Sequence, residues 1–237
     1  GPEKLDPIYT GKVTTDKNGF AKIKVKGRKE PGFTTVKVWT NHNGQKYQNM
    51  TNIGYEPYEI EPTTTLPEDF KEFWDNELAK AAKVPMLTRV EYVAEQSDDK
   101  VDVYNVRVQS YKRGNYIYGV LSVPKSEGKK AAILRLPGAA VRSFSGPNSL
   151  AYEGFIVFEI GVHGIPVDHD PEMYRALSSG PLGGYATIGL EDKNTFYYKR
   201  VYLGCVRAID YLCSREDVDS ERIAVYGGSQ GGMLSIV

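Results

Sequence analysis

The spacing of apolar and polar positions divides the chain into a first part typical of strands and turns and a second part in which strands alternate with helices. In the first part, apolar and charged residues alternate over 20–26 and again over 33–39, which predicts strands. Further strands are expected at 12–15 and within 45–58, with turns between them. Four or five strands are fewer than the roughly seven of an immunoglobulin-like sandwich. We therefore expect residues 1–61 to form a small, partial β-sandwich (Ig-like) module.

The second part, residues 62–237, has the pattern of an α/β domain. Apolar residues at helical spacing predict helices over 70–82 and 195–213. Strands are predicted around 90–94, 101–108, 116–123, 131–136, 155–160 and 223–226. Because strands and helices alternate from residue 116 onward, we expect a doubly wound, mostly parallel sheet with right-handed crossovers.

Composition excludes several classes of protein. The 30 Lys and Arg residues balance the 30 Asp and Glu residues, whereas a nucleic-acid or anionic-membrane binder needs an excess of positive charge. No apolar run approaches the roughly 20 residues that span a bilayer. We therefore expect neither a nucleic acid nor a membrane as a partner.

The sequence Gly-Gly-Ser-Gln-Gly-Gly at 227–232 directly follows the last predicted strand and matches the pattern G-x-S-x-G. In a nucleophile elbow, small neighbours let the backbone close into a strained strand-to-helix turn that exposes the serine. Ser229 is then the candidate nucleophile, and the backbone amide of Gln230 is a candidate oxyanion donor. The alternative is a glycine-rich turn in which the serine caps a helix.

Two other positions are candidates for the same site. The loop after strand 131–136 begins Leu-Pro-Gly-Ala-Ala, and the amide of Ala139 is the candidate second oxyanion donor; the alternative is a simple Pro-Gly turn. His163 follows strand 155–160 and either lines the substrate pocket or anchors its loop. Together with Asp168–Asp170 it matches no metal-binding spacing, so no metal site is expected.

These motifs occur within a longer resemblance. Residues from about 66 to 237 resemble the acetyl xylan esterase and cephalosporin C deacetylase family of α/β-hydrolases, most clearly at 67–74, 195–202, 206–210 and 218–232. The resemblance implies an α/β-hydrolase fold, Ser229 as nucleophile, and the amides of Gln230 and Ala139 as oxyanion donors. It also implies removal of acetyl groups from acetylated oligosaccharides or polysaccharides such as xylan, without a cofactor. Residues 165–194 resemble an insertion that shapes the pocket and subunit contacts, which makes a homo-oligomer an open expectation.

The sequence departs from the family pattern at three places. Ala139 stands where the family usually has a tyrosine, His163-Gly164-Ile165 replaces Arg-Gly-Gln, and the β-rich first module is additional. Because of these departures, the sequence does not identify which acylated glycan is the substrate. A β-sandwich fused to a polysaccharide-type esterase fits a periplasmic or secreted location.

The catalytic partners of the serine are the largest gap in the pattern. In α/β-hydrolases the acid and the histidine follow the serine in chain order, but His42, His163 and His169 all precede Ser229, and no Asp, Glu or His follows it. We therefore expect the chain to be a fragment of a longer hydrolase, incomplete at the C-terminal end of its sheet and inactive alone.

Two other functions remain open on the sequence. The first is a serine peptidase of the prolyl-oligopeptidase type, which carries a similar elbow on this fold. The second is a non-enzymatic glycan-binding protein in which the β-rich module is the working part and the hydrolase body is degenerate.

Overall fold

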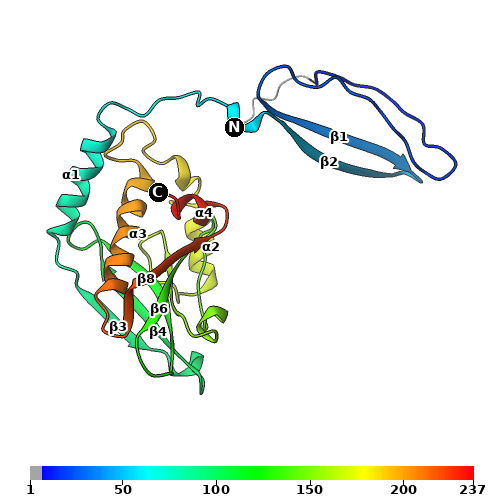
Figure 1. The fold of residues 1–237 in the computed structure, drawn as a ribbon. Coiled ribbons are helices and arrows are strands. Elements are labelled where there is room, and N and C mark those ends of the chain that lie inside the picture. Colours follow the sequence, from blue (N-terminus) through cyan, green and yellow to red (C-terminus); the bar gives the residue numbers. More distant parts are fainter. Residues whose placement is uncertain (1–6) are drawn as a thin grey trace. The chain divides into compact units, whose positions relative to one another are not determined.

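The computed structural model describes residues 7–237, and the chain divides into two compact units, one that ends at Pro67 and one that begins at Glu68. The first unit is built on an antiparallel hairpin of β1 (Gly32–His42) and β2 (Gln45–Tyr55) (Figure 1). Its turn is Asn43-Gly44, with φ of 49° and 77°. Left-handed conformations at both positions match the twist of the flanking strands, which is why Asn-Gly is favoured there.

The predicted strands at 12–15 and 20–26 do not form. Residues 7–31 contain no strand, although the turn at 17–19 is present and Asp16 accepts hydrogen bonds from the amides of Asn18 and Phe20. Alternation with period two gives a strand only where a neighbouring edge takes up its hydrogen bonds, and the side chain of Phe20 is 73% exposed rather than packed. Residues 7–61 therefore contain two strands instead of the four or five expected, and the Ig-like module is not confirmed.

The second unit begins with α1 (Phe70–Ala82), as the sequence predicts. A six-stranded sheet follows, in the spatial order β3-β4-β5-β7-β6-β8. Its strands are β3 (Thr88–Tyr92), β4 (Val101–Gln109), β5 (Tyr116–Pro124), β6 (Lys130–Leu136), β7 (Ile156–Gly161) and β8 (Val218–Gly227). Each strand overlaps one predicted from the pattern.

The expectation of a mostly parallel sheet requires correction, because the sheet is mixed. β4 pairs antiparallel with both β3 and β5, and β5 pairs antiparallel with β7. Only β6 pairs in parallel, with β7 on one side and β8 on the other. The connection between β4 and β5 covers only residues 110–115, and a parallel pair needs a crossover of about a dozen residues or more. The short connection therefore forces β5 to run antiparallel to β4.

The two faces of the sheet are covered differently. The main core lies between the sheet and α3 (Tyr197–Cys213), which packs against β4 to β8 and contacts α1 (Figure 1). Alternate residues of the same strands face two smaller clusters on the other side, where the short 3₁₀ helix Ser149–Ala151 packs against β5 and β7. Within residues 7–237, no helix combines the length and apolarity needed to cross a membrane.

Candidate active site

The strand β8 ends at Gly227, and after Gly228 and Ser229 the chain enters the short helix α4 (Gln230–Leu234). Ser229 has φ 54° and ψ −120°, and its side chain is exposed. A positive φ is uncommon for a residue other than glycine and is held only where the surrounding structure enforces it. The backbone thus has the strained strand-to-helix turn that the G-x-S-x-G pattern predicts.

Steric crowding explains why two of the elbow positions are glycine. A Cβ at Gly227 would lie 2.6 Å from the carbonyl oxygen of Gly231, and a Cβ at Gly231 would overlap the carbonyl oxygen of Leu136. A Cβ at Gly228 would meet nothing within 4 Å. Positions 227 and 231 therefore require glycine, because there the backbone passes against itself and against the end of β6, whereas position 228 does not.

The loop after β6 lies directly against this elbow. A Cβ on Gly231 would lie 3.2 Å from the carbonyl oxygen of Pro137, and a Cβ on Gly138 would lie 3.7 Å from that of Gly228. Ala139 is exposed on the same loop. Among the described residues, neither the amide of Ala139 nor that of Gln230 donates to a protein acceptor. Backbone amides without an acceptor are the kind of donor that binds the oxyanion of a tetrahedral intermediate.

The side chain of Gln230 is buried beneath the elbow, with 7% of its surface exposed. Its Oε1 accepts hydrogen bonds from the hydroxyls of Tyr185 (2.6 Å) and Tyr198 (2.7 Å), and its Nε2 donates to the carbonyl oxygen of Pro137 at 3.3 Å. Burial raises the pKa of Tyr185 to about 12 and also raises the pKa of Tyr198. Both phenols therefore keep their protons and act as donors.

Sequence reasoning missed this network, although it identified the backbone amide of Gln230. Tyr198 comes from α3, and Tyr185 comes from a 3₁₀ turn (Tyr185–Thr187) in the irregular stretch before that helix. No periodicity links an irregular segment to a residue 45 positions further along the chain. The excess of tyrosine in the sequence (17 residues) is the one signal that points to an aromatic cluster.

His163 is also buried and is bonded at both ring nitrogens. Its Nε2 lies 2.9 Å from the carbonyl oxygen of Ala140, and its Nδ1 lies 2.6 Å from the hydroxyl of Tyr197. Because a carbonyl only accepts, Nε2 carries the proton and Nδ1 accepts from the phenol. Burial, together with the positive charge of Arg200, lowers the pKa of His163 and favours the neutral ring. These contacts favour the loop-anchoring interpretation over direct contact with substrate.

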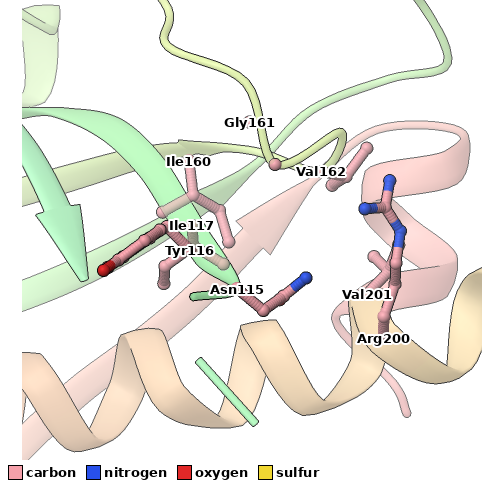
Figure 2. A pocket seen from close by; sticks show the side chains of 9 residues that line it. Asn115, Tyr116, Ile117, Ile160, Gly161, Val162, Arg200 and Val201 are labelled. Atoms are coloured by element: carbon pink, nitrogen blue, oxygen red, sulfur yellow. The ribbon is translucent and has the colours of Figure 1, made fainter. Parts of the chain in front are cut away.

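The space beside His163 is too small for a sugar. Figure 2 shows the cavity formed where the start of β5, the end of β7 and α3 meet, with Arg200 among the residues that line it. Its volume is about 10 Å³, which is room for about one water molecule. Arg200 donates to the carbonyl oxygen of His163 at 3.0 Å, and its guanidinium lies 4.2 Å from the centre of the Tyr197 ring. These contacts brace the loop, and the cavity itself has no room for a sugar.

No histidine of the second unit is available to Ser229 as a base. Both nitrogens of His163 are engaged. His169 lines an open groove of about 250 Å³ on β3, β4 and β5, and β7 and β6 separate those strands from β8. The remaining histidine, His42, belongs to the first unit.

The polar run at 168–170 has structural contacts. Asp168 accepts a hydrogen bond from the side-chain amide of Asn105 at 2.9 Å, and Asp170 caps the helix α2 (Pro171–Ser179) by accepting from the amide of Glu172 at 2.7 Å. In the part of the chain that the structure describes, no group of three or more His, Cys, Asp or Glu residues is arranged to hold a metal ion.

Comparison with known proteins gives a consistent family. A model of the acetyl xylan esterase family matches residues 54–237. The acetyl esterase Axe7A of Xylanibacter ruminicola is 36% identical over 242 aligned residues, which cover 100% of this chain and 54% of the relative. The chain thus spans about half the length of this relative.

Solved structures agree. An acetyl xylan esterase from Paenibacillus sp. R4 is 35% identical with a TM-score of 0.61, over 73% of this chain and 55% of the other. Acetyl xylan esterase 1 from Thermoanaerobacterium sp. JW/SL YS485 is 26% identical with a TM-score of 0.61, over 72% and 53%. These matches confirm the α/β-hydrolase fold, with the mixed sheet described above. On the family match and the 36% identity along its whole length, the chain belongs to the acetyl xylan esterase family.

Proposed function

We propose that the chain supplies the nucleophile and the oxyanion site of a serine esterase that removes acetyl groups from acetylated carbohydrates. The observation that carries this proposal is the positive φ at Ser229, in a turn that packs against the loop carrying Ala139. The backbone amides of Gln230 and Ala139 have no acceptor among the described residues. The names of the relatives, an acetyl esterase and acetyl xylan esterases, support acetylated xylan fragments as the substrate class.

In the proposed reaction, Oγ of Ser229 attacks the acetyl carbonyl carbon and its proton passes to a histidine base. The amides of Gln230 and Ala139 bind the oxygen that becomes negative in the tetrahedral intermediate. Collapse of the intermediate releases the sugar hydroxyl, which takes the proton from the histidine. Water then hydrolyses the acetyl-serine and regenerates the enzyme with release of acetate.

The base and its orienting acid are proposed to come from outside these 237 residues. Without a base, a serine hydroxyl is protonated at neutral pH and is a poor nucleophile. The part of the relatives' length that the chain does not cover is the proposed source of both groups. Below, "full-length enzyme" means the polypeptide that carries these 237 residues together with that acid and histidine.

The proposal is tested with Ser229→Ala in the full-length enzyme, assayed on an aryl acetate and on an acetylated xylo-oligosaccharide. Loss of a triad nucleophile leaves only the oxyanion site and binding, so kcat should fall by roughly 10⁴- to 10⁶-fold. Ser220→Ala, at an exposed serine of β8, is the matched control and should retain full activity. Near wild-type turnover by Ser229→Ala, or cleavage of a dipeptidyl chromogenic substrate in preference to acetyl esters, would overturn the assignment.

A further inference from the structure

We propose that the side chains of Gln230 and His163 are positioning residues that together hold the loop 137–140, so that the amide of Ala139 stays aimed at the oxyanion. This inference rests on the proposed function, because it assigns a task to groups behind the same site. It concerns the side chain of Gln230, whereas the reaction itself uses only the backbone amide of that residue.

The loop is held mainly from its two ends. Nε2 of Gln230 donates to the carbonyl oxygen of Pro137 at 3.3 Å, and Nε2 of His163 donates to that of Ala140 at 2.9 Å. Only Gly138 and Ala139 lie between these two carbonyls. The pairing of β6 with β8 ends at Leu136. Residues 137–143, which follow it, make no backbone-to-backbone hydrogen bond with any other residue of 7–237. A loop with a glycine and no ladder samples several conformations unless side chains restrain it.

The direction of the Gln230 amide is fixed by its partners. Two phenols donate to Oε1, at 2.6 and 2.7 Å, so Oε1 is saturated and the amino group must point to Pro137. These phenols come from Tyr185 and Tyr198, whose pKa values burial raises. Gln230 therefore carries one oxyanion donor on its backbone and restrains the other donor through its side chain.

The two anchors belong to one aromatic cluster. The ring of His163 meets that of Tyr185 edge-on at 4.7 Å between centroids, and Tyr185 in turn packs against Tyr197 and Tyr198. Tyr197 donates to Nδ1 of His163. The cluster connects the segment before α3, α3 itself and the elbow. A displacement of any of these three elements would therefore move the side chains that hold the carbonyls of Pro137 and Ala140.

The expected kinetic signature follows from where the amide acts. Negative charge develops on this oxygen only as the tetrahedral intermediate forms, so misplacing the Ala139 amide should lower kcat and leave KM nearly unchanged. Complete removal of one oxyanion donor costs about 10²- to 10³-fold. A displaced donor should cost less, roughly 10- to 100-fold in kcat.

The sharpest test is Gln230→Glu in the full-length enzyme, with kcat compared with wild type across pH. A protonated glutamic acid can still accept from both phenols and donate to Pro137, whereas a carboxylate repels that carbonyl oxygen. Near pH 8 the kcat of the variant should therefore be about 10- to 100-fold below that of wild type. As the pH falls, the ratio of the two kcat values should rise toward one. The titratable groups that face this position are Tyr185 and Tyr198, with His163 behind them, and none of them becomes charged as the introduced carboxyl group loses its proton.

The chain offers a matched control in Gln109. This glutamine is 3% exposed, its Nε2 donates to the carbonyl oxygen of Pro85 at 2.8 Å, and its Oε1 accepts from the amide of Gly114 at 3.0 Å. It ends β4, whereas the elbow follows β8 at the other end of the strand order. Gln109→Glu introduces the same charge beside a proline carbonyl, and it should lower the unfolding temperature while leaving the kcat ratio independent of pH.

A second variant keeps the test decisive if Gln230→Glu does not fold. Replacing Tyr185 and Tyr198 together by phenylalanine preserves the packing but frees the Gln230 amide, and should lower kcat at constant KM. Wild-type kcat in this folded double variant, or a Gln230→Glu ratio that stays at one across pH, overturns the positioning role. Full activity of Ser229→Ala would instead overturn the proposed function, so the two failures are distinguishable.

Discussion

The imidazole of His163 is bonded at both nitrogens and buried, so its protonation is coupled to the stability of the fold. Burial lowers its pKa below the usual value of 6.5. As pH falls through about 6.5, His163 therefore binds a proton in the unfolded chain but stays neutral in the folded protein. The contribution of the neutral ring to the free energy of unfolding is complete above that pH, and it is lost as the pH drops toward the pKa of His163 in the folded protein. The rings facing the imidazole are those of Tyr185 and Tyr197, and the positive charge of Arg200 also lowers its pKa.

We predict that His163→Gln flattens the dependence of unfolding free energy on pH below about 6.5. Wild type should lose at most about 1.4 kcal/mol per pH unit through this group, and the variant, whose amide does not titrate, should lose less. Chemical denaturation of the full-length enzyme at several pH values measures the slope. His42→Gln, at an exposed hairpin position, is the control. Equal slopes for wild type and His163→Gln would contradict the prediction.

At this scale the sequence predicts the backbone chemistry of the site better than its side-chain contacts. The pattern around Ser229 anticipates the strained elbow, because the pattern exists for a steric reason that is local to a few residues. The contacts of Gln230 with Tyr185 and Tyr198 depend on how an irregular segment folds over α3. Local spacing does not encode such contacts between residues distant in sequence.

Among elements, the turn from β8 to α4 is sensitive to added atoms at some positions and tolerant at others. Gly231→Ala would drive its Cβ into the carbonyl of Leu136, whereas Gly228→Ala would point into open space at a backbone without positive φ. We predict that Gly231→Ala destabilises the protein by about 1–3 kcal/mol or more, as overpacking does, and that Gly228→Ala costs less than about 1 kcal/mol. Denaturant unfolding of both variants in the full-length enzyme measures the difference, and equal costs would contradict the steric account.

The sequence pattern predicted which segments are helices and strands, but it did not predict strand direction or which strands pair. Apolar periodicity predicted α1, α3 and each strand of the sheet. It did not reveal that the short connection after β4 makes β5 antiparallel, because side-chain pattern is the same in either direction. The alternation at 20–26 also failed as a strand signal, because no neighbouring strand pairs with it.

For the whole molecule, we predict that the purified 237-residue chain releases acetate from aryl acetates roughly 10⁴-fold or more slowly than the full-length enzyme, because only the oxyanion site and binding remain. Within the second unit, His163 is bonded at both ring nitrogens and His169 lies in the groove on β3, β4 and β5, so Ser229 has no histidine base there. The strand β8 also pairs only with β6 among the described strands, and Tyr226 on it is 59% exposed. An open edge of this kind promotes association.

The measurement is acetate release by a monodisperse sample of the chain, with Ser229→Ala as the control. Turnover at the full-length rate that Ser229→Ala abolishes would show that one of the three histidines serves as base. Restoration of activity on mixing with the second half of the full-length enzyme would support the proposed division of the site.

The positive φ at Ser229 also restricts which other nucleophile could take its place. At φ 54° a side chain branched at Cβ is a genuine outlier, because its second substituent is forced against the neighbouring backbone. Threonine, although it offers the same hydroxyl, does not fit this turn. Cysteine is unbranched and does fit. The turn therefore admits an unbranched thiol in place of the serine hydroxyl, whereas a secondary alcohol would require a different backbone.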